Sequence, residues 1–85
     1  MFAAFCLARK NLSGPRLGLT VPRALGGSVV RNRIKRRIRE AFRLHRAAIG
    51  TQWDIVINPR RAALTASFAE IEHGIERVAE VLRRE

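Results

Sequence analysis

The sequence predicts a small two-layer α+β domain with the element order β-β-α-β-α. Three short apolar runs, bounded by Gly, Pro and charged residues, are typical of strands. Two longer segments repeat their apolar residues every three or four positions, which is typical of amphipathic helices. A chain of 85 residues is long enough for one domain, so we expect residues 1–85 to share a single core.

The first two predicted strands are Phe2–Ala8 and Arg16–Val21. The first is an apolar run, and the second alternates apolar residues with Gly and Thr. Ser13-Gly14-Pro15 between them is a turn signal, so the pair is predicted to form a hairpin.

A basic helix is predicted from Val29 or Val30 to Ala48. Ser28 is its expected N-cap, and Gly50 is its expected C-terminal stop. On a helical wheel one side is apolar and suited to a core. That side consists of Val30, Ile34, Ile38, Ala41, Phe42, His45 and Ile49.

The third strand is predicted at Trp53–Ile57, with Trp53 as a core anchor, and Asn58–Arg61 ends it. A final helix is predicted at Ser67–Arg84, where Ser67 and Glu70 have the spacing of a capping box. Its expected buried stripe consists of Phe68, Ile71, Ile75, Val78 and Leu82.

Positive charge is concentrated on the basic helix. The chain has a formal net charge of +10, and residues 30–49 hold eight of its 17 Arg and Lys residues against one acid, Glu40. Opposite the apolar side runs a ridge of Asn32, Arg36, Arg39 and Arg43, with Lys35 and Arg46 beside it. A solvated face usually mixes both signs to form ion pairs, so a ridge of one sign favours a polyanion such as RNA.

The sequence of this helix resembles a known family. Arg31–Arg43, RNRIKRRIREAFR, resembles the R-N-x-x-K-R-x-x-R-E signature of the bacterial ribonuclease P protein subunit. The flanking segments resemble the family as well: Arg16–Val21, Leu25–Val30, Asp54–Ile57 and Ser67-Phe68.

The resemblance implies a function and a partner. The family's RNA subunit is the catalyst, and the protein assists removal of the 5′ leader from precursor tRNA. By motif position, the residues implied to contact the RNA subunit are Arg31, Asn32, Lys35, Arg36 and Arg39. Wheel position adds Arg33, Arg43 and Arg46 to the same surface, and Arg23 lies in the loop before it. The family also implies a left-handed strand–helix–strand crossover around this helix, against the usual right-handed rule.

One departure from the family concerns the leader. Family members usually carry a helix and a strand before the segment that matches Phe2–Ala8, and these are expected to be lacking here. Phe2 and Phe5 could stack on leader bases, as aromatic residues do in single-strand binders. Burial in the core is the favoured interpretation of both, because so small a domain has few large side chains to spare.

No catalytic group is predicted in the protein. His45 falls on the apolar side of the basic helix and is expected to be a half-buried core residue, whereas His73 lies on the final helix. Cys6 is expected to be a small buried apolar residue, and no set of metal ligands is apparent. We therefore expect no cofactor on the protein, and Mg²⁺ on the partner RNA to drive the hydrolysis.

Three other functions are compatible with part of the sequence. A generic RNA-binding structural protein, such as a small ribosomal protein, fits the charge. A helix-turn-helix DNA binder is disfavoured because strands precede the basic helix. A membrane-surface helix is disfavoured because its apolar side is needed for packing on a sheet. With one cysteine and no apolar run long enough to span a membrane, the cytoplasm is the expected compartment.

Overall fold

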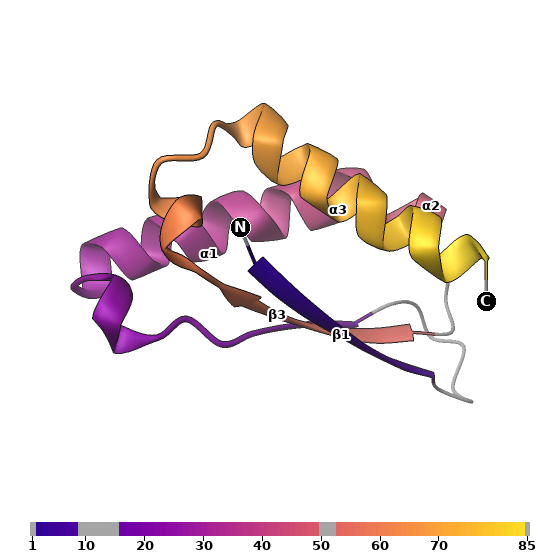
Figure 1. Cartoon of the computed structure of the whole chain (residues 1–85), viewed down its shortest axis with the longest axis horizontal. Coiled ribbons are helices and arrows are strands. Elements are labelled where there is room, and N and C mark those ends of the chain that lie inside the picture. Colours follow the sequence, from indigo (N-terminus) through magenta and orange to yellow (C-terminus); the bar gives the residue numbers. More distant parts are fainter. Residues whose placement is uncertain (1, 9–15, 50–52, 85) are drawn as a thin grey trace.

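The computed structural model describes residues 2–8, 16–49 and 53–84, and it places helices on one face of a mixed β-sheet (Figure 1). The elements are β1 (Phe2–Ala8), β2 (Arg16–Leu19), η1 (Arg23–Leu25), α1 (Ser28–Leu44), α2 (Arg46–Ile49), β3 (Trp53–Pro59), η2 (Arg61–Leu64) and α3 (Phe68–Arg83). The predicted α+β class and the order of its main elements are confirmed.

The strands are arranged in the order β1-β3-β2, so the predicted hairpin is wrong. β1 runs antiparallel to β3, with Phe5 opposite Val56, and β2 runs parallel to β3, with Gly18 opposite Val56. Alternation fixes which residues share a face of a strand, but it does not say which strand pairs with which. β3 is the central strand, and Ile55 and Ile57 on its helix-covered face are buried.

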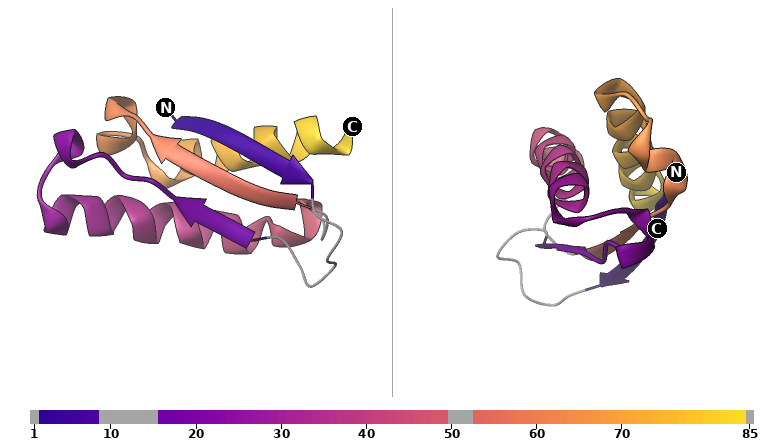
Figure 2. Two further views of the ribbon diagram at one scale, coloured as in Figure 1. Left: turned by 90° about the horizontal axis from the view of Figure 1, so that it is seen from below. Right: turned by 90° about the vertical axis from the view of Figure 1, so that its left-hand side faces the viewer.

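The unit β2–α1–β3 is a crossover between parallel strands. Seen from the sheet side, β2 and β3 point the same way, and the chain that connects them runs through α1 behind the sheet (Figure 2). With the strands pointing up, the chain enters at the left strand, returns through the helix behind, and leaves in the right strand. This is the left-handed connection that the resemblance implies.

The basic helix differs from the prediction at both ends. Its N-cap is Gly27, which has no side chain to cap the helix, and Ser28 is already helical. The preceding Gly26 has a φ of 144°, a conformation that favours glycine. At its other end α1 stops at Leu44, His45 makes a turn, and α2 continues to Ile49. The predicted stop at Gly50 lies outside the described residues.

The core lies between the sheet and the two long helices. Ile38 of α1, Ile55 and Ile57 of β3, and Ile71 and Ile75 of α3 are almost fully buried. Both predicted helix stripes face this core. On α1 its buried members are Ile34, Ile38, Ala41 and Phe42. Trp53 is half-buried and packs against the same cluster.

The two phenylalanines of β1 lie on opposite faces of the sheet. Phe2 packs under α3 against Gly74, where an added Cβ would lie 2.6 Å from the Phe2 ring. The absence of a side chain at Gly74 therefore makes room for this aromatic ring. Phe5 is 60% exposed on the face that carries no helix, so the core interpretation of Phe5 is wrong.

Candidate nucleic-acid interface

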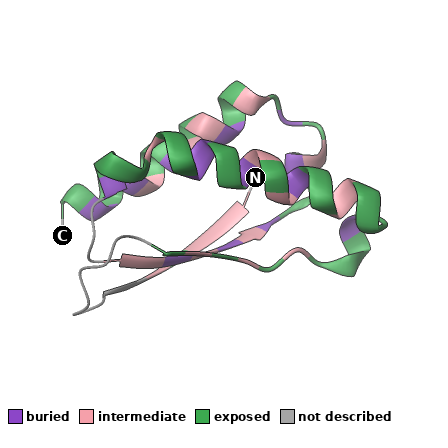
Figure 3. Cartoon of the chain, turned by 180° about the vertical axis from the view of Figure 1, so that it is seen from behind, coloured by how far each residue is buried: buried purple, intermediate pink, exposed green. Residues whose placement is uncertain are grey.

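From Ile34 onward, the helix α1 has one buried and one exposed side (Figure 3). The exposed residues include every member of the predicted ridge: Asn32, Arg36, Arg39 and Arg43. Arg33 and Arg46 are exposed as well. We call these six residues the α1 ridge. The helix thus presents a row of side chains outward while its Ile and Phe side chains hold it to the sheet.

Most cations of the α1 ridge have no protein partner. In the part of the chain that the structure describes, Arg33, Arg36 and Arg39 make neither a hydrogen bond nor an ion pair. Arg43 is the exception, since its Nε donates to Glu40 Oε2 at 3.1 Å and its second guanidinium nitrogen to the other oxygen. This hydrogen bond lowers the pKa of Glu40 and raises that of Arg43. A bidentate exposed pair of this kind is screened by water, so Arg43 remains available to a stronger anion.

Two of the predicted contact residues are not part of the exposed ridge but lie beside it. Arg31 and Lys35 are half-buried. The Nε of Arg31 is buried and has no hydrogen-bond partner among the described residues. The motif therefore spans the boundary between the ridge and the protein interior.

Arg37 serves the fold. Its guanidinium donates to the backbone oxygen of Ala66 at 2.9 Å, and Ala66 lies just before α3. This bond ties α1 to the start of the final helix. The sequence pattern does not predict this contact. The one indication in the sequence is the position of Arg37 on the helical wheel, between the apolar side and the ridge.

His45 connects the two helices at the turn between α1 and α2. Its Nε2 lies 3.1 Å from Glu72 Oε2 and 3.6 Å from Glu76 Oε1, both on α3. Its half-buried position confirms the prediction, but its partners are carboxylates and not only core side chains. This contact holds the end of the basic segment against α3.

Further cations gather near the N-terminal end of α1. Arg23 lies in η1, Arg60 precedes η2 and Arg61 lies within it, and all three are exposed. Both short helices lie against α1, at the left of Figure 1. The positive surface therefore extends beyond the ridge to the end of the sheet where β2 and β3 finish.

The open face of the sheet offers a different surface. Phe5, Val56 and Gly18 lie in one row across the three strands. Because Gly18 has no side chain, the backbone of β2 is uncovered beside Val56 in this row. Arg16 and Asp54 lie in the neighbouring row, with Arg16 Nε 3.5 Å from Asp54 Oδ1. The face thus combines one exposed aromatic ring with a flat strip of backbone.

The described residues include no group of three or more His, Cys, Asp or Glu side chains placed to hold a metal. No helix in the same part of the chain is long and apolar enough to cross a bilayer.

Comparison with known proteins identifies the family. A family model described as Ribonuclease P matches residues 2–83, and the chain belongs to this family. The ribonuclease P protein component of Desulfosudis oleivorans is 47% identical over 60 residues, which is 71% of this chain and 50% of that protein. The protein component of Staphylococcus epidermidis is 35% identical over 82 residues, or 96% of this chain and 70% of that protein. The chain therefore spans from half to somewhat over two thirds of these relatives.

Solved structures agree with this assignment. A Staphylococcus aureus RNase P protein mutant with defective mRNA degradation activity superposes with a TM-score of 0.81 at 34% identity, covering 96% of this chain and 69% of that one. The RNase P protein from Thermotoga maritima superposes with a TM-score of 0.80 at 28% identity, covering 99% and 76%. The fold and the family predicted from the α1 motif are both confirmed.

Proposed function

We propose that this chain is the protein subunit of a bacterial ribonuclease P and binds the catalytic RNA through the α1 ridge. The observation that carries the proposal is the row of exposed guanidinium groups, of which Arg33, Arg36 and Arg39 have no protein partner in the described part of the chain. Arg suits this role because its planar fork binds phosphate oxygens in pairs. Family membership supports RNA as the polyanion.

The chain's contribution is to bind and position RNA. Each guanidinium placed on a phosphate releases a condensed counterion, which favours assembly at low ionic strength. It also reduces the phosphate repulsion that Mg²⁺ would otherwise have to screen. The bond-breaking chemistry belongs, in this proposal, to Mg²⁺ ions held by the RNA. The assembly would work in the cytoplasm, on precursor tRNA.

The open face of the sheet is proposed as the surface for the single-stranded 5′ leader. Phe5 supports this assignment, because an exposed aromatic ring on a sheet gives a base a platform for stacking. The row through Val56 and Gly18 would let an extended strand of nucleotides cross the sheet at close range. Phe2 is half-buried on the other face, under α3, and is not part of this surface.

Reconstitution tests the main proposal. The 85-residue chain is added to a bacterial ribonuclease P RNA and a precursor tRNA at a Mg²⁺ concentration where the RNA alone is slow. We expect faster release of the leader and tighter binding to this RNA than to an unrelated folded RNA of equal length. Equal binding to both RNAs, without faster cleavage, would instead identify a generic RNA-binding protein.

The leader surface has a separate test. Phe5→Ala should weaken binding of precursor tRNA to the assembled complex by about 1–3 kcal/mol and leave binding of mature tRNA unchanged. Val81→Ala is the matched control, because Val81 is also a largely exposed apolar residue but lies on α3. Equal effects of the two substitutions would remove the leader from the open face of the sheet.

A further inference from the structure

The short helix η2 carries two exposed arginines beside the α1 ridge. Arg61 is the first residue of η2, and Arg60 is its N-cap. In the part of the chain that the structure describes, the side chains of Arg60 and Arg61 make neither a hydrogen bond nor an ion pair. Because η2 lies against α1, these two charges continue the positive surface of the ridge onto a second element.

The position of η2 depends on how its two ends are held. A 3-10 helix of four residues has poor hydrogen-bond geometry and adds little order by itself. Within it the Ala63 N–H donates to the Arg60 backbone oxygen at 2.9 Å, and the Ala63 side chain is buried. At the start of η2 the chain is held by Pro59, the last residue of β3, which is almost fully buried.

Arg37 of α1 holds the other end of η2. Its guanidinium donates to the backbone oxygen of Ala66 at 2.9 Å, and Ala66 is buried. η2 ends at Leu64, so this carbonyl lies only two residues beyond it. Arg37 comes directly after Arg36 of the ridge and directly before the buried Ile38. The bond therefore fixes the end of η2 relative to the ridge.

The fold alone gives little reason for a charged residue at position 37. The partner of Arg37 is a neutral carbonyl, and among the described residues Arg37 forms no ion pair with an acid. One hydrogen bond from a half-buried side chain adds little net stability, because water would otherwise satisfy both groups. A cation beside the start of α3 is also unfavourable for the dipole of that helix.

The charges on η2 and on the ridge give a stronger reason for this bond. Arg60 and Arg61 have the same sign as the ridge, so in the free protein the two sets of arginines repel each other. A bond from α1 to the end of η2 opposes this repulsion before any RNA is bound. A surface that is ordered in advance loses less entropy on binding than one that the ligand must assemble.

We propose that Arg37 is a positioning residue that holds Arg60 and Arg61 beside the α1 ridge, so that both elements bind one RNA. Arg37 acts through η2 and needs no contact of its own with the RNA. The proposal rests on the proposed function, because that function makes RNA the polyanion that the ridge binds.

Hydrogen exchange of the free 85-residue protein tests the bond without RNA. Arg37→Met removes the donor but keeps a side chain that packs well in a helix. We expect the Ala63 amide to exchange about threefold faster or more, because η2 loses the support of one end. The Ile75 amide of α3 serves as the reference for global stability and should change less.

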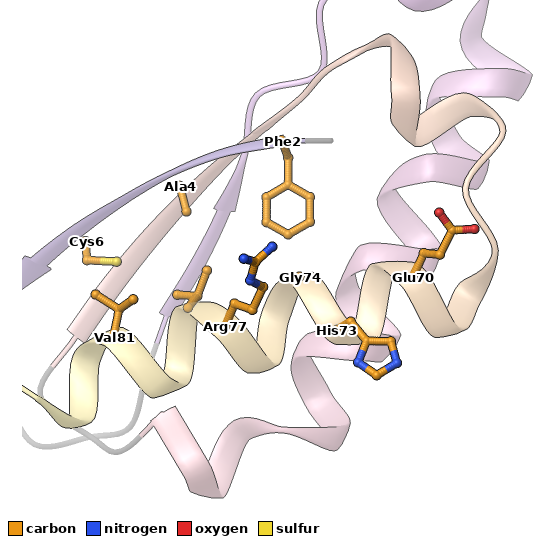
Figure 4. A pocket seen from close by; sticks show the side chains of 9 residues that line it. Phe2, Ala4, Cys6, Glu70, His73, Gly74, Arg77 and Val81 are labelled. Atoms are coloured by element: carbon orange, nitrogen blue, oxygen red, sulfur yellow. The ribbon is translucent and has the colours of Figure 1, made fainter.

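Arg77→Met is the matched control for the loss of one charge. Arg77 lines a groove of about 560 Å³ whose described lining residues all come from β1 and α3 (Figure 4). This variant should leave exchange of the Ala63 amide unchanged. Equal exchange of that amide in the two Met variants would overturn the proposal.

A double-mutant cycle tests the role of Arg37 in binding ribonuclease P RNA. In the wild-type background, Arg60→Ala combined with Arg61→Ala should weaken binding about fivefold or more and reduce the salt slope by about 1–2. In the Arg37→Met background the same pair should have about half that effect or less, because η2 is no longer held beside the ridge. Arg39→Ala, on the ridge itself, should have the same effect in both backgrounds.

The conservative variant Arg37→Lys completes the cycle. Lys keeps the charge and can donate to the Ala66 oxygen, so it should restore most of the effect of the η2 pair. An equal effect of that pair in all three backgrounds, or no effect in the wild type, would overturn the positioning role. A changed effect of Arg39→Ala in the Arg37→Met background would show that α1 itself is disturbed, and it would overturn the proposal as well.

Failure of the proposed function would look different. A wild-type chain that does not prefer ribonuclease P RNA to an unrelated RNA would overturn the proposed function, and this inference with it. Failure of this inference alone leaves that preference intact, while Arg37→Met and the η2 pair act independently. The exchange of the Ala63 amide is measured without RNA, so it separates the two cases.

Discussion

The helices α1 and α3 cover the same face of the sheet, and both bury a stripe of apolar residues, but their outer faces differ. On α3, Arg84 pairs with Glu80 at 3.0 Å, and Glu72 and Glu76 face His45. On α1, three consecutive ridge arginines have no partner in the described part of the chain. The outer face of α3 mixes acids with its arginines and pairs some of them, whereas α1 carries one acid, Glu40, against its row of arginines.

The two N-termini show the same contrast. α3 begins with a capping box, in which Ser67 Oγ accepts from the Glu70 N–H and the Glu70 carboxylate accepts from the Ser67 N–H. α1 begins at Gly27 with no side-chain cap and no acid in its first turn. Acids at this end stabilise a helix through its dipole, so α1 forgoes a local gain. A negatively charged partner bound at this end would supply the negative charge that the first turn of α1 lacks.

The largest expected effect tests whether the buried stripes of α1 and α3 contribute equally to stability. Ile38→Ala on α1 and Ile75→Ala on α3 should each lower the free energy of unfolding by about 2–5 kcal/mol, because both side chains are almost fully buried. Urea denaturation measures the loss. A much smaller loss at Ile38 would mean that α1 is held mainly by something other than its stripe.

The next effect should separate the two outer faces. Arg36→Ala combined with Arg39→Ala should weaken binding to ribonuclease P RNA about tenfold or more and reduce the salt slope by about 1–2. Arg77→Ala combined with Arg83→Ala removes the same charge from exposed positions of α3 and should change the slope little. Filter binding across a salt series gives both values. Matching losses would show that net charge alone governs binding.

A smaller effect is expected at the two helix starts. Ser67→Ala should cost about 1 kcal/mol of stability, because it removes the cap of α3. Ser28→Ala should cost almost nothing, because Ser28 lies inside α1 and makes no capping bond. Thermal or urea unfolding of both variants, side by side, checks this difference. A loss at Ser28 similar to that at Ser67 would contradict the assignment of Gly27 as the N-cap.

The smallest effect concerns the only acid of α1. Glu40→Gln should tighten RNA binding by a few fold and steepen the salt slope by up to about 1, because it releases Arg43.

Lowering the pH to 5 should not release Arg43 in the same way. Hydrogen bonding from Arg43 lowers the pKa of Glu40 below its ordinary value. The ion pair is therefore complete at any pH above the ordinary Glu pKa, and it is lost only as the pH falls through the lowered pKa. RNA affinity measured at pH 7 and pH 5 should therefore differ little through Glu40.

Features that depend on local periodicity could be predicted from the sequence. The stripe of α1, the capping box of α3 and the exposed ridge all follow from residues a few positions apart. The same stretch carried the motif that identified the family. The faces of a helix are set by its 3.6 residues per turn, independently of the rest of the chain, so the structure confirms these predictions.

Other features depended on which segments meet. A hairpin and a crossover both satisfy the alternation in β1 and β2, and only the pairing of each with β3 decides between them. That pairing placed Phe5 on the face of the sheet that carries no helix. The bond from Arg37 to Ala66 and the contact of His45 with Glu72 join residues 29 and 27 positions apart.

The sequence by itself determined two amphipathic helices, the sign and place of the charge, and the family. The tertiary structure decided the strand order, the exposed aromatic ring and which ridge arginines lack a partner among the described residues. The physical reason is range: helix faces and caps arise from neighbours in the chain, whereas sheet pairing and side-chain partners arise from the packing of distant segments.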